Sequence, residues 1–400
     1  MAFSPMQQEY FDKATHRWNI KSGATRSGKT FMDYFVIPKR IRAVKGLPGL
    51  VVILGNTRGT LQRNIIEPLQ DIWGSELVSS IKQDNTATMF GEKVYCLGAD
   101  KANQVDRLRG SSIKYCYGDE VVTWSESVFT MLKSRLDKPY SRFDGTCNPD
   151  NPNHWFYSFL HSNADIYLQE YTLHDNPYLS SDFVKNLEDE YRGTVFFDRY
   201  ILGKWTLAEG LIYPYGADGK ATVPDEPRAY TKYVVSIDYG TLNPCSMGLW
   251  GLCDGVWYRI REYYYSGRSE KHNLTDEQYY IKLVELIGGL PISKIVVDPS
   301  AASFIACIRA HRRYIVREAN NAVLDGIRNT AVALTAQKIK ICECCTNTLA
   351  EFSAYRWDEN AGEDRPIKEN DHAMDDMRYF VNTILHNTSG FFAEVRGDVI

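Results

Sequence analysis

The first half of the chain alternates short apolar runs with longer stretches whose apolar residues recur at helical spacing. A continuous apolar run, "GLVVILG" at residues 49–55, has the pattern of a buried strand, and residues 61–73 after it have the pattern of a helix. Four further segments contain strand patterns: residues 87–99, 112–122, 141–149 and 164–173. Strands that alternate with helices predict an α/β domain with a largely parallel sheet.

The alternation stops between residues 207 and 231, where glycine, proline and aspartate are frequent. A chain of 400 residues is too long for a typical single core, so two domains are expected. We therefore predict a first domain at residues 1–206, a linker at 207–231 and a second domain at 232–400.

The second half begins with an apolar strand that ends in Asp238. Strand patterns on either side of Asp254-Gly255 predict a hairpin, because Asp-Gly supplies the left-handed backbone of a tight turn. A helix at residues 276–287, a strand that ends in Asp298 and a closing helix at residues 370–380 follow. By analogy, this order of elements is that of a mixed α/β domain of the RNase H-like nuclease type.

Residues 23–30, "GATRSGKT", satisfy the pattern G-x-x-x-x-G-K-[ST] between a predicted strand and a predicted helix. The two glycines let the backbone curl so that its N–H groups face phosphate oxygens. The lysine reaches the β- and γ-phosphates, and the threonine hydroxyl binds Mg²⁺. The loop therefore predicts an ATP site, whose expected contacts are Gly23, Arg26, Ser27, Gly28, Lys29 and Thr30.

Two acids, Asp119 and Glu120, end a later strand-like run. We expect Asp119 to hold the Mg²⁺ of the nucleotide and Glu120 to take the proton of the attacking water, which predicts ATP hydrolysis rather than a nucleotide switch. Thr146 and Asn148, after another strand, either sense the γ-phosphate or form an ordinary Asn-Pro turn. Arg26 either stabilises charge on the γ-phosphate or faces solvent.

Three aspartates and one histidine of the second domain predict a metal-dependent nuclease site. Asp238 and Asp298 each end an apolar strand, and Asp375 lies on the closing helix three residues after His372. Asp376, four residues after the histidine, is an alternative to Asp375. Clustered carboxylates repel one another and need cations, and two hard divalent ions clamp a phosphate and activate a water. The expected ligands of two Mg²⁺ or Mn²⁺ ions are Asp238, Asp298, Asp375 and His372.

Together these motifs resemble the large terminase subunit of tailed bacteriophages and prophages over nearly the whole chain. The resemblance rests on the P-loop, on "GDE" and "TCNP", and on the acidic segments "SIDYG", "VVDPS" and "DHAMDDMRY". It implies a P-loop NTPase domain of the ASCE type followed by an RNase H-like nuclease domain. The His-x-x-Asp form of the last segment is most similar to the PBSX-like subfamily. The strand before Asp119 departs from the family pattern, because Tyr115, Cys116 and Tyr117 replace the usual aliphatic residues.

The resemblance implies an ATP-driven motor that moves double-stranded viral DNA into the procapsid and an endonuclease that cuts concatemeric DNA. In such a motor Thr146 and Asn148 would couple hydrolysis to movement. A glutamine near the N-terminus resembles the family's adenine-binding element, for which we expect Gln8, with Gln7 as the alternative. The implied partners are double-stranded DNA, the portal protein, the small terminase subunit and further copies of the chain in a ring, in the host cytoplasm and without a membrane.

Composition adds few constraints. The net charge of −4 gives no overall indication of nucleic-acid binding, and no apolar run approaches the length of a membrane span. The nine cysteines mostly stand singly in apolar runs, and "CECC" at residues 342–345 lacks the second ligand pair of a zinc site. Two other classes of protein remain: a P-loop helicase or repair ATPase-nuclease outside packaging, and a nucleotide-gated scaffold, which Glu120 disfavours.

Overall fold

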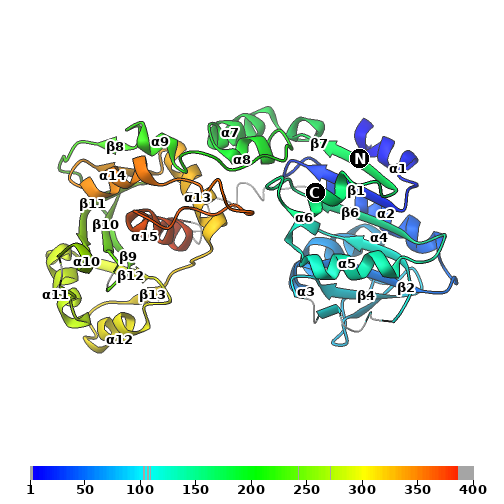
Figure 1. The fold of residues 1–400 in the computed structure, drawn as a ribbon, viewed down its shortest axis with the longest axis horizontal. Coiled ribbons are helices and arrows are strands. Elements are labelled where there is room, and N and C mark those ends of the chain that lie inside the picture. Colours follow the sequence, from blue (N-terminus) through cyan, green and yellow to red (C-terminus); the bar gives the residue numbers. More distant parts are fainter. Residues whose placement is uncertain are drawn as a thin grey trace. The chain divides into compact units, whose positions relative to one another are not determined.

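The computed structural model describes residues 3–101, 104–105, 108, 110–241, 243–270 and 272–385. Within these residues the chain forms two compact units, each organised around a seven-stranded sheet (Figure 1). The first unit contains Met1–Lys185 and Phe197–Leu207, and the second contains Asn186–Phe196 and Ala208–Ile400.

The sheet of the first unit has the strand order β3-β4-β2-β5-β6-β1-β7. Its neighbouring strands are parallel except for the antiparallel pair β3 and β4. The predicted α/β domain with a largely parallel sheet is therefore confirmed. The strands are β1 (Trp18–Gly23), β2 (Leu50–Gly55), β3 (Thr86–Met89), β4 (Glu92–Gly98), β5 (Ile113–Gly118), β6 (Arg142–Cys147) and β7 (Ile166–Tyr171).

Helices cover both faces of this sheet, and successive residues of each strand point to opposite faces. In β2, Val52 packs with α5 and α6, whereas Val51 packs with α2 and α4. Tyr115 and Tyr117 of β5 lie on the α2 side, where their rings fill the place expected for aliphatic residues. The helices up to residue 200 are α1 (Pro5–Lys13), α2 (Lys29–Ala43), α3 (Arg58–Leu61), α4 (Glu67–Trp73), α5 (Glu126–Arg135), α6 (Trp155–Leu160), α7 (Ser181–Tyr191) and α8 (Val195–Tyr200), with shorter turns at η1 (Gln62–Ile66), η3 (Val121–Thr123) and η4 (Leu173–Asp175).

The sheet of the second unit has the order β13-β12-β9-β10-β11-β14-β8. Strands β9, β10 and β11 are antiparallel, and the other neighbours are parallel. The predicted hairpin is confirmed, since Asp254 and Gly255 join β10 to β11 with φ of 50° and 77°. The strands are β8 (Thr222–Val223), β9 (Lys232–Asp238), β10 (Cys245–Cys253), β11 (Val256–Tyr265), β12 (Ile292–Val297), β13 (Val316–Glu318) and β14 (Ile339–Cys342).

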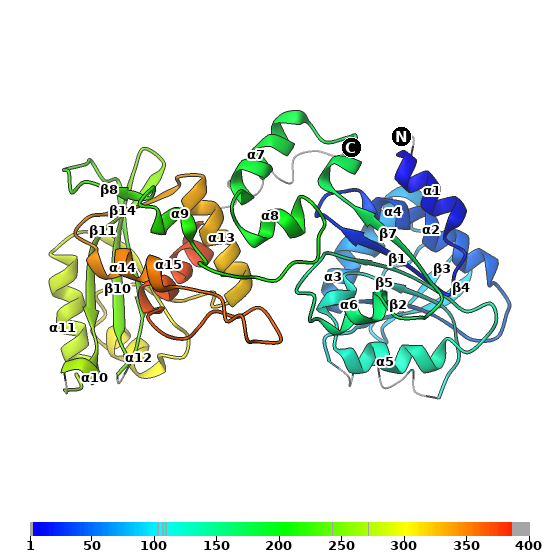
Figure 2. The same cartoon turned by 45° about the horizontal axis from the view of Figure 1, so that its top comes forward.

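Helices also cover both faces of the second sheet (Figure 2). Apolar side chains of α11 and α12 pack on one face of β9 and β10, and α15 lies against the other face of the same strands. The helices are α9 (Pro214–Ala217), α10 (Gly267–Glu270), α11 (Asp276–Ile287), α12 (Ala302–Ala310), α13 (Val323–Thr335), α14 (Thr346–Ala354) and α15 (His372–Phe380), followed by the turn η5 (Val381–Leu385). None of the helices in the described ranges has the length and apolar character needed to cross a membrane.

The segment expected to be a linker, residues 207–231, contains α9 and β8. Strand β8 pairs with β14, so this segment is part of the second sheet. A strand of two residues in a Gly- and Pro-rich stretch shows no periodic pattern, and its partners Ile341 and Cys342 are far away in the sequence. Tertiary pairing rather than local preference therefore forms this strand.

The aromatic core between the first sheet and α5 gives a stability prediction. Phe129 is fully buried, and its ring centroid lies 4.7 Å from that of Phe159 and 5.1 Å from that of Trp18. We expect Phe129→Ala to lower the free energy of unfolding by about 3–5 kcal/mol, because it removes these contacts and leaves a cavity. Urea unfolding measures this. Leu77→Ala, at an exposed position, is the control and should change stability by less than about 0.5 kcal/mol; equal losses would contradict the assignment of this core.

Candidate functional site

The loop between β1 and α2 carries the phosphate-binding pattern, and its two glycines have conformations that other residues rarely adopt. Gly23 has φ 150°, and a Cβ atom there would lie 2.1 Å from the carbonyl oxygen of Tyr171. Gly28 has φ 87° and precedes α2 as its N-cap. The loop thus ends at a helix N-terminus, where free N–H groups and the helix dipole favour an anion.

The Lys29 side chain connects this loop to the end of β6. Its Nζ atom donates to the carbonyl oxygens of Gly23 and Ala24, at 2.8 and 2.6 Å, and to Asn148 Oδ1 at 3.1 Å. Burial lowers the pKa of Lys29 to about 8. Ser27 is buried beside it, with Oγ 3.4 Å from Nζ. The structure therefore brings Lys29, Ser27 and Asn148 together, as the sequence predicted for a single site.

The acids at the end of β5 adjoin the same site through Thr146. The Thr146 hydroxyl donates to Asp119 Oδ1 and accepts from the Glu120 backbone N–H, each at 3.3 Å. Burial, reinforced by the charges of Glu120 and Asp33, raises the pKa of Asp119 to about 7. Glu120 is exposed and has a left-handed backbone with φ 49°, which turns its side chain out of the strand direction. A buried acid and an exposed acid stand next to each other, as metal binding and proton transfer require.

Other predicted nucleotide contacts lie around the loop, and for one of them the neighbouring residue in the sequence makes the contact. Gln7, not Gln8, touches the loop: its Nε2 donates to the carbonyl oxygen of Gly28 at 3.0 Å. Gln8 is exposed and donates to Asp12 at 3.0 Å. On the first turns of α1 the two glutamines face different directions, and the capping box between Gln7 and Ser4 fixes which one points inward. Arg26 is exposed with φ 63°, and Thr30 is half-buried in the first turn of α2.

In the second unit, Asp238 and Asp298 follow neighbouring parallel strands, β9 and β12, at the same edge of the sheet. The backbone N–H of Asp298 donates to the carbonyl oxygen of Ile237 at 3.2 Å, which fixes the two strand ends together. Burial raises the pKa of Asp238 to about 6, against the opposing effect of His372, whose Nδ1 is hydrogen-bonded to Asp238 Oδ2 at 2.8 Å. Asp238 and His372 are thus direct partners.

Helix α15 brings Asp375 and Tyr379 to this edge. The Tyr379 hydroxyl donates to Asp298 Oδ2 at 3.1 Å. Asp375 accepts from Lys368 Nζ at 3.1 Å and from the Arg378 guanidinium at 2.9 Å. Because carboxylates repel one another, these two cations stabilise a buried aspartate close to other acids. The second site is therefore a set of carboxylates with one imidazole and adjacent basic side chains.

The carboxylate oxygens of Asp238, Asp298 and Asp375 do not form a compact group. Among the described His, Cys, Asp and Glu residues, one group of three has its ligand atoms within 4.8 Å of one another, and it contains none of Asp238, Asp298 and Asp375. The donor set nevertheless fits Mg²⁺ or Mn²⁺ by its chemistry, since hard divalent ions take carboxylate oxygens and Mn²⁺ also accepts an imidazole.

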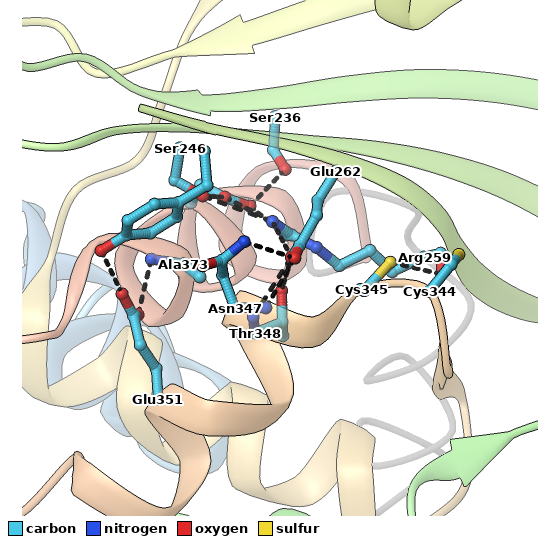
Figure 3. A network of polar contacts seen from close by, with 12 residues as sticks. Ser236, Ser246, Arg259, Glu262, Cys344, Cys345, Asn347, Thr348, Glu351 and Ala373 are labelled. Atoms are coloured by element: carbon cyan, nitrogen blue, oxygen red, sulfur yellow. Dashed lines mark hydrogen bonds and ion pairs between the residues drawn. The ribbon is translucent and has the colours of Figure 1, made fainter. Parts of the chain in front are cut away.

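Asp376, the alternative acid of α15, has a different environment, and its partners Ser236, Ser246 and Arg259 are labelled in Figure 3. It is fully buried and accepts a hydrogen bond from Ser236 at 2.9 Å, another from Ser246, and a bidentate contact from Arg259, with one arm at 2.8 Å. Arg259 is fully buried as well. Both oxygens of Asp376 are therefore engaged in holding α15 on the sheet by a fully buried counter-charge, which leaves Asp375 as the candidate acid of this helix.

A second buried acid, Glu351 of α14, binds the beginning of α15 (Figure 3). Its Oε2 accepts from the backbone N–H groups of Ala373 and Met374 at 2.7 and 3.2 Å, and its Oε1 accepts from the Tyr264 hydroxyl at 2.7 Å. A carboxylate satisfies the free N–H groups of a helix N-terminus and interacts favourably with its dipole. Glu351 and Asp376 together fix α15, and with it His372 and Asp375.

Four residues at or beneath this site were not found from the sequence: Arg259, Glu351, Lys368 and Tyr379. Only Arg259 leaves a signal. It occupies an inward position of an alternating strand, next but one to the buried Trp257, and a buried arginine requires an acid partner.

Comparison with known proteins agrees with this architecture. The family model "Terminase large subunit, T4likevirus-type, N-terminal" matches residues 20–216. A structure of the large terminase from a thermophilic bacteriophage in complex with ADP is 38% identical, with a TM-score of 0.85, over 96% of this chain and 100% of that chain. Two further structures of the same phage protein, one in complex with ATP-gamma-S, are each 37% identical over the same shares, with TM-scores of 0.87 and 0.83. Among curated proteins no match is found.

A P-loop ATPase domain joined to an RNase H-like nuclease domain defines a class of enzyme that uses ATP and acts on nucleic acid. The identity and coverage are decisive within that class: the chain belongs to the terminase large-subunit family. As a member it is an ATPase and a nuclease of viral DNA packaging, and a helicase or repair enzyme outside packaging is not favoured.

The Arg259–Asp376 pair gives a prediction for the second unit. We expect Arg259→Leu to lower the free energy of unfolding by about 3–5 kcal/mol, because it leaves a buried carboxylate without its counter-charge. The double variant Arg259→Leu/Asp376→Leu should recover much of this loss, since no unpaired charge remains. Urea unfolding of both variants measures the coupling. A double variant that is no more stable than Arg259→Leu would contradict the pairing.

Proposed function

We propose that the first unit hydrolyses ATP at the loop Gly23–Thr30 and that the second unit cuts DNA at Asp238, Asp298 and Asp375. The observation that supports the first half most strongly is the contact of Lys29 with Asn148, which joins the P-loop to a neighbouring strand end. We assign residues 1–206 to the ATPase domain, 232–400 to the nuclease domain, and 207–231 to a connection whose strand β8 joins the second sheet.

In the ATPase domain, the N–H groups of the loop and of the first turn of α2 bind the phosphates, and Lys29 binds their β and γ oxygens. Thr30 and Asp119 would hold Mg²⁺, which would supply positive charge beside the phosphates. Glu120 accepts the proton of the water whose oxygen attacks the γ-phosphorus, as the bond to the ADP oxygen breaks. Arg26, exposed in the same loop, stabilises charge that develops on the transferred phosphoryl group.

Gln7 takes the role that Gln8 was expected to have, because its amide contacts the loop at Gly28. Thr146 and Asn148 couple hydrolysis to movement. Thr146 is hydrogen-bonded to both acids that follow β5, and Asn148 accepts from Lys29. A change at the γ-phosphate therefore reaches the end of β6 through two polar side chains.

In the nuclease domain, Asp238, Asp298 and Asp375 hold two divalent ions, Mg²⁺ or Mn²⁺. Bound there, the ions supply a clamp on the scissile phosphate and an activated water. His372 orients the Asp238 carboxylate through its hydrogen bond at 2.8 Å. Lys368 and Arg378 balance the charge of Asp375 and keep its carboxylate at the sheet edge.

The partners follow from this assignment. The motor translocates double-stranded DNA, and the nuclease cuts concatemeric DNA at the start and end of packaging. We infer that the chain works in the cytoplasm of the host as a ring on the portal protein, together with a small terminase subunit. We infer the ring because a single subunit does not move processively along DNA well.

The role of Glu120 is tested by Glu120→Gln. We expect ATP turnover to fall on the order of 10²-fold or more, because the amide cannot accept the proton, while nucleotide binding persists. Phosphate release and nucleotide binding are measured on the same preparations. Glu126→Gln, an exposed position in the first turn of α5, is the matched control and should retain turnover. Turnover that survives in Glu120→Gln would exclude Glu120 as the base.

The nuclease acids are tested by Asp238→Asn. We expect cleavage of plasmid DNA with Mg²⁺ or Mn²⁺ to fall by more than about 100-fold. Loss of a metal ligand lowers activity at least as much as loss of a residue that only hydrogen-bonds to a ligand. ATP turnover should be unchanged. Asp254→Asn is the control, since an asparagine tolerates the left-handed turn of the β10–β11 hairpin. Unchanged cleavage in Asp238→Asn would refute the site.

A further inference from the structure

A group of three potential metal ligands lies on the face of the second sheet opposite to α15. Glu277 stands in the first turn of α11, Cys307 lies on α12, and His311 follows directly after α12 as its C-cap. Their ligand atoms all lie within 4.8 Å of one another. Glu277 is the centre of the group: its Oε1 accepts from Cys307 Sγ at 3.5 Å, and its Oε2 lies 3.0 Å from His311 Nε2.

The geometry of this group arises from the packing of α11 against α12. Cys307 and His311 are four residues apart, so they lie on one side of the same helix, one turn from each other. The apolar core beneath both helices fixes their relative position. Tyr280, one turn after Glu277 on α11, stacks on the His311 ring with centroids 3.7 Å apart and planes at 2°. The imidazole is thus held with Nε2 directed toward the carboxylate and the thiol.

We propose that Glu277, Cys307 and His311 form a binding site for a zinc-class divalent cation, with water as the fourth ligand. A thiolate, an imidazole and a carboxylate are the donors that Zn²⁺ takes in tetrahedral sites, and three protein ligands with an open position are a known arrangement. This site is separate from the nuclease acids and goes beyond the proposed function, because a thiolate selects softer ions than Mg²⁺ or Mn²⁺.

Charge and proton balance are consistent with such an ion. On binding, the Cys307 thiol releases its proton to solvent and a metal–sulfur bond forms. The thiolate and the Glu277 carboxylate then carry two negative charges, which a divalent ion neutralises, while His311 binds as the neutral imidazole. The bound ion would connect the beginning of α11 to the end of α12 and stabilise this helix pair.

Cobalt binding to the full-length chain tests the site directly, because Co²⁺ replaces Zn²⁺ and reports a thiolate ligand by a charge-transfer band in the near ultraviolet. We expect one such Co²⁺ per chain, displaced by Zn²⁺. Ions held by carboxylates and imidazole, without a thiolate, do not give this band, so the nuclease site does not interfere. Zn²⁺ should also raise the melting temperature of the wild-type chain.

Two variants locate the ligands. Cys307→Ser should abolish the band, and His311→Ala, at a more exposed position, should weaken Co²⁺ affinity by at least about tenfold. Cys344→Ser is the matched control, because it removes an exposed cysteine outside the group and should leave binding unchanged. Absence of the band in the wild type, or a band that persists unchanged in Cys307→Ser, would overturn the proposal.

Discussion

The buried ion pair between Arg259 and Asp376 is the interaction on which the second unit depends most. Both side chains are fully buried, and the serines Ser236 and Ser246 complete the hydrogen bonds of the carboxylate. Burial of a charge pair is costly unless the two charges meet in good geometry, so the bidentate contact of Arg259 with Asp376 favours one position of α15 on β9, β10 and β11. Because His372 and Asp375 are on the same helix, this ion pair also sets the position of Asp375, the proposed metal ligand of α15.

In the first unit, backbone geometry fixes the position of the site. Its site lies at the carboxyl ends of β1, β5 and β6, which are adjacent in a parallel sheet and therefore deliver their following loops to one edge. Gly23 can approach Tyr171 only because it has no Cβ atom. The hydrogen bonds of Lys29 to Asn148 and of Thr146 to Asp119 then connect the three loops. In both units rigid strands set the place of the acids, and a helix supplies the remaining groups.

The sequence was most informative where a local pattern determines the structure. The glycines and lysine of the P-loop, the Asp254-Gly255 hairpin and the alternation of strands and helices follow from short-range rules, and the structure has them. The choice between Gln7 and Gln8 could not be predicted from the sequence, because it depends on how α1 packs against the P-loop. The same holds for the two neighbouring acids Asp375 and Asp376: their different roles arise from Arg259, more than a hundred residues earlier, and spacing alone left both open. The group of Glu277, Cys307 and His311 was missed for a similar reason, since its glutamate lies 30 residues before Cys307 and comes from another helix.

The proposed metal ligands of the nuclease are Asp238, Asp298 and Asp375, which the ends of β9 and β12 and helix α15 bring to one edge of the sheet. Anomalous X-ray scattering from crystals of the chain soaked in Mn²⁺ tests this most directly. We expect anomalous peaks bonded to the carboxylates of these three residues. Peaks bonded to Asp376, or none at the common edge of β9 and β12, would contradict it.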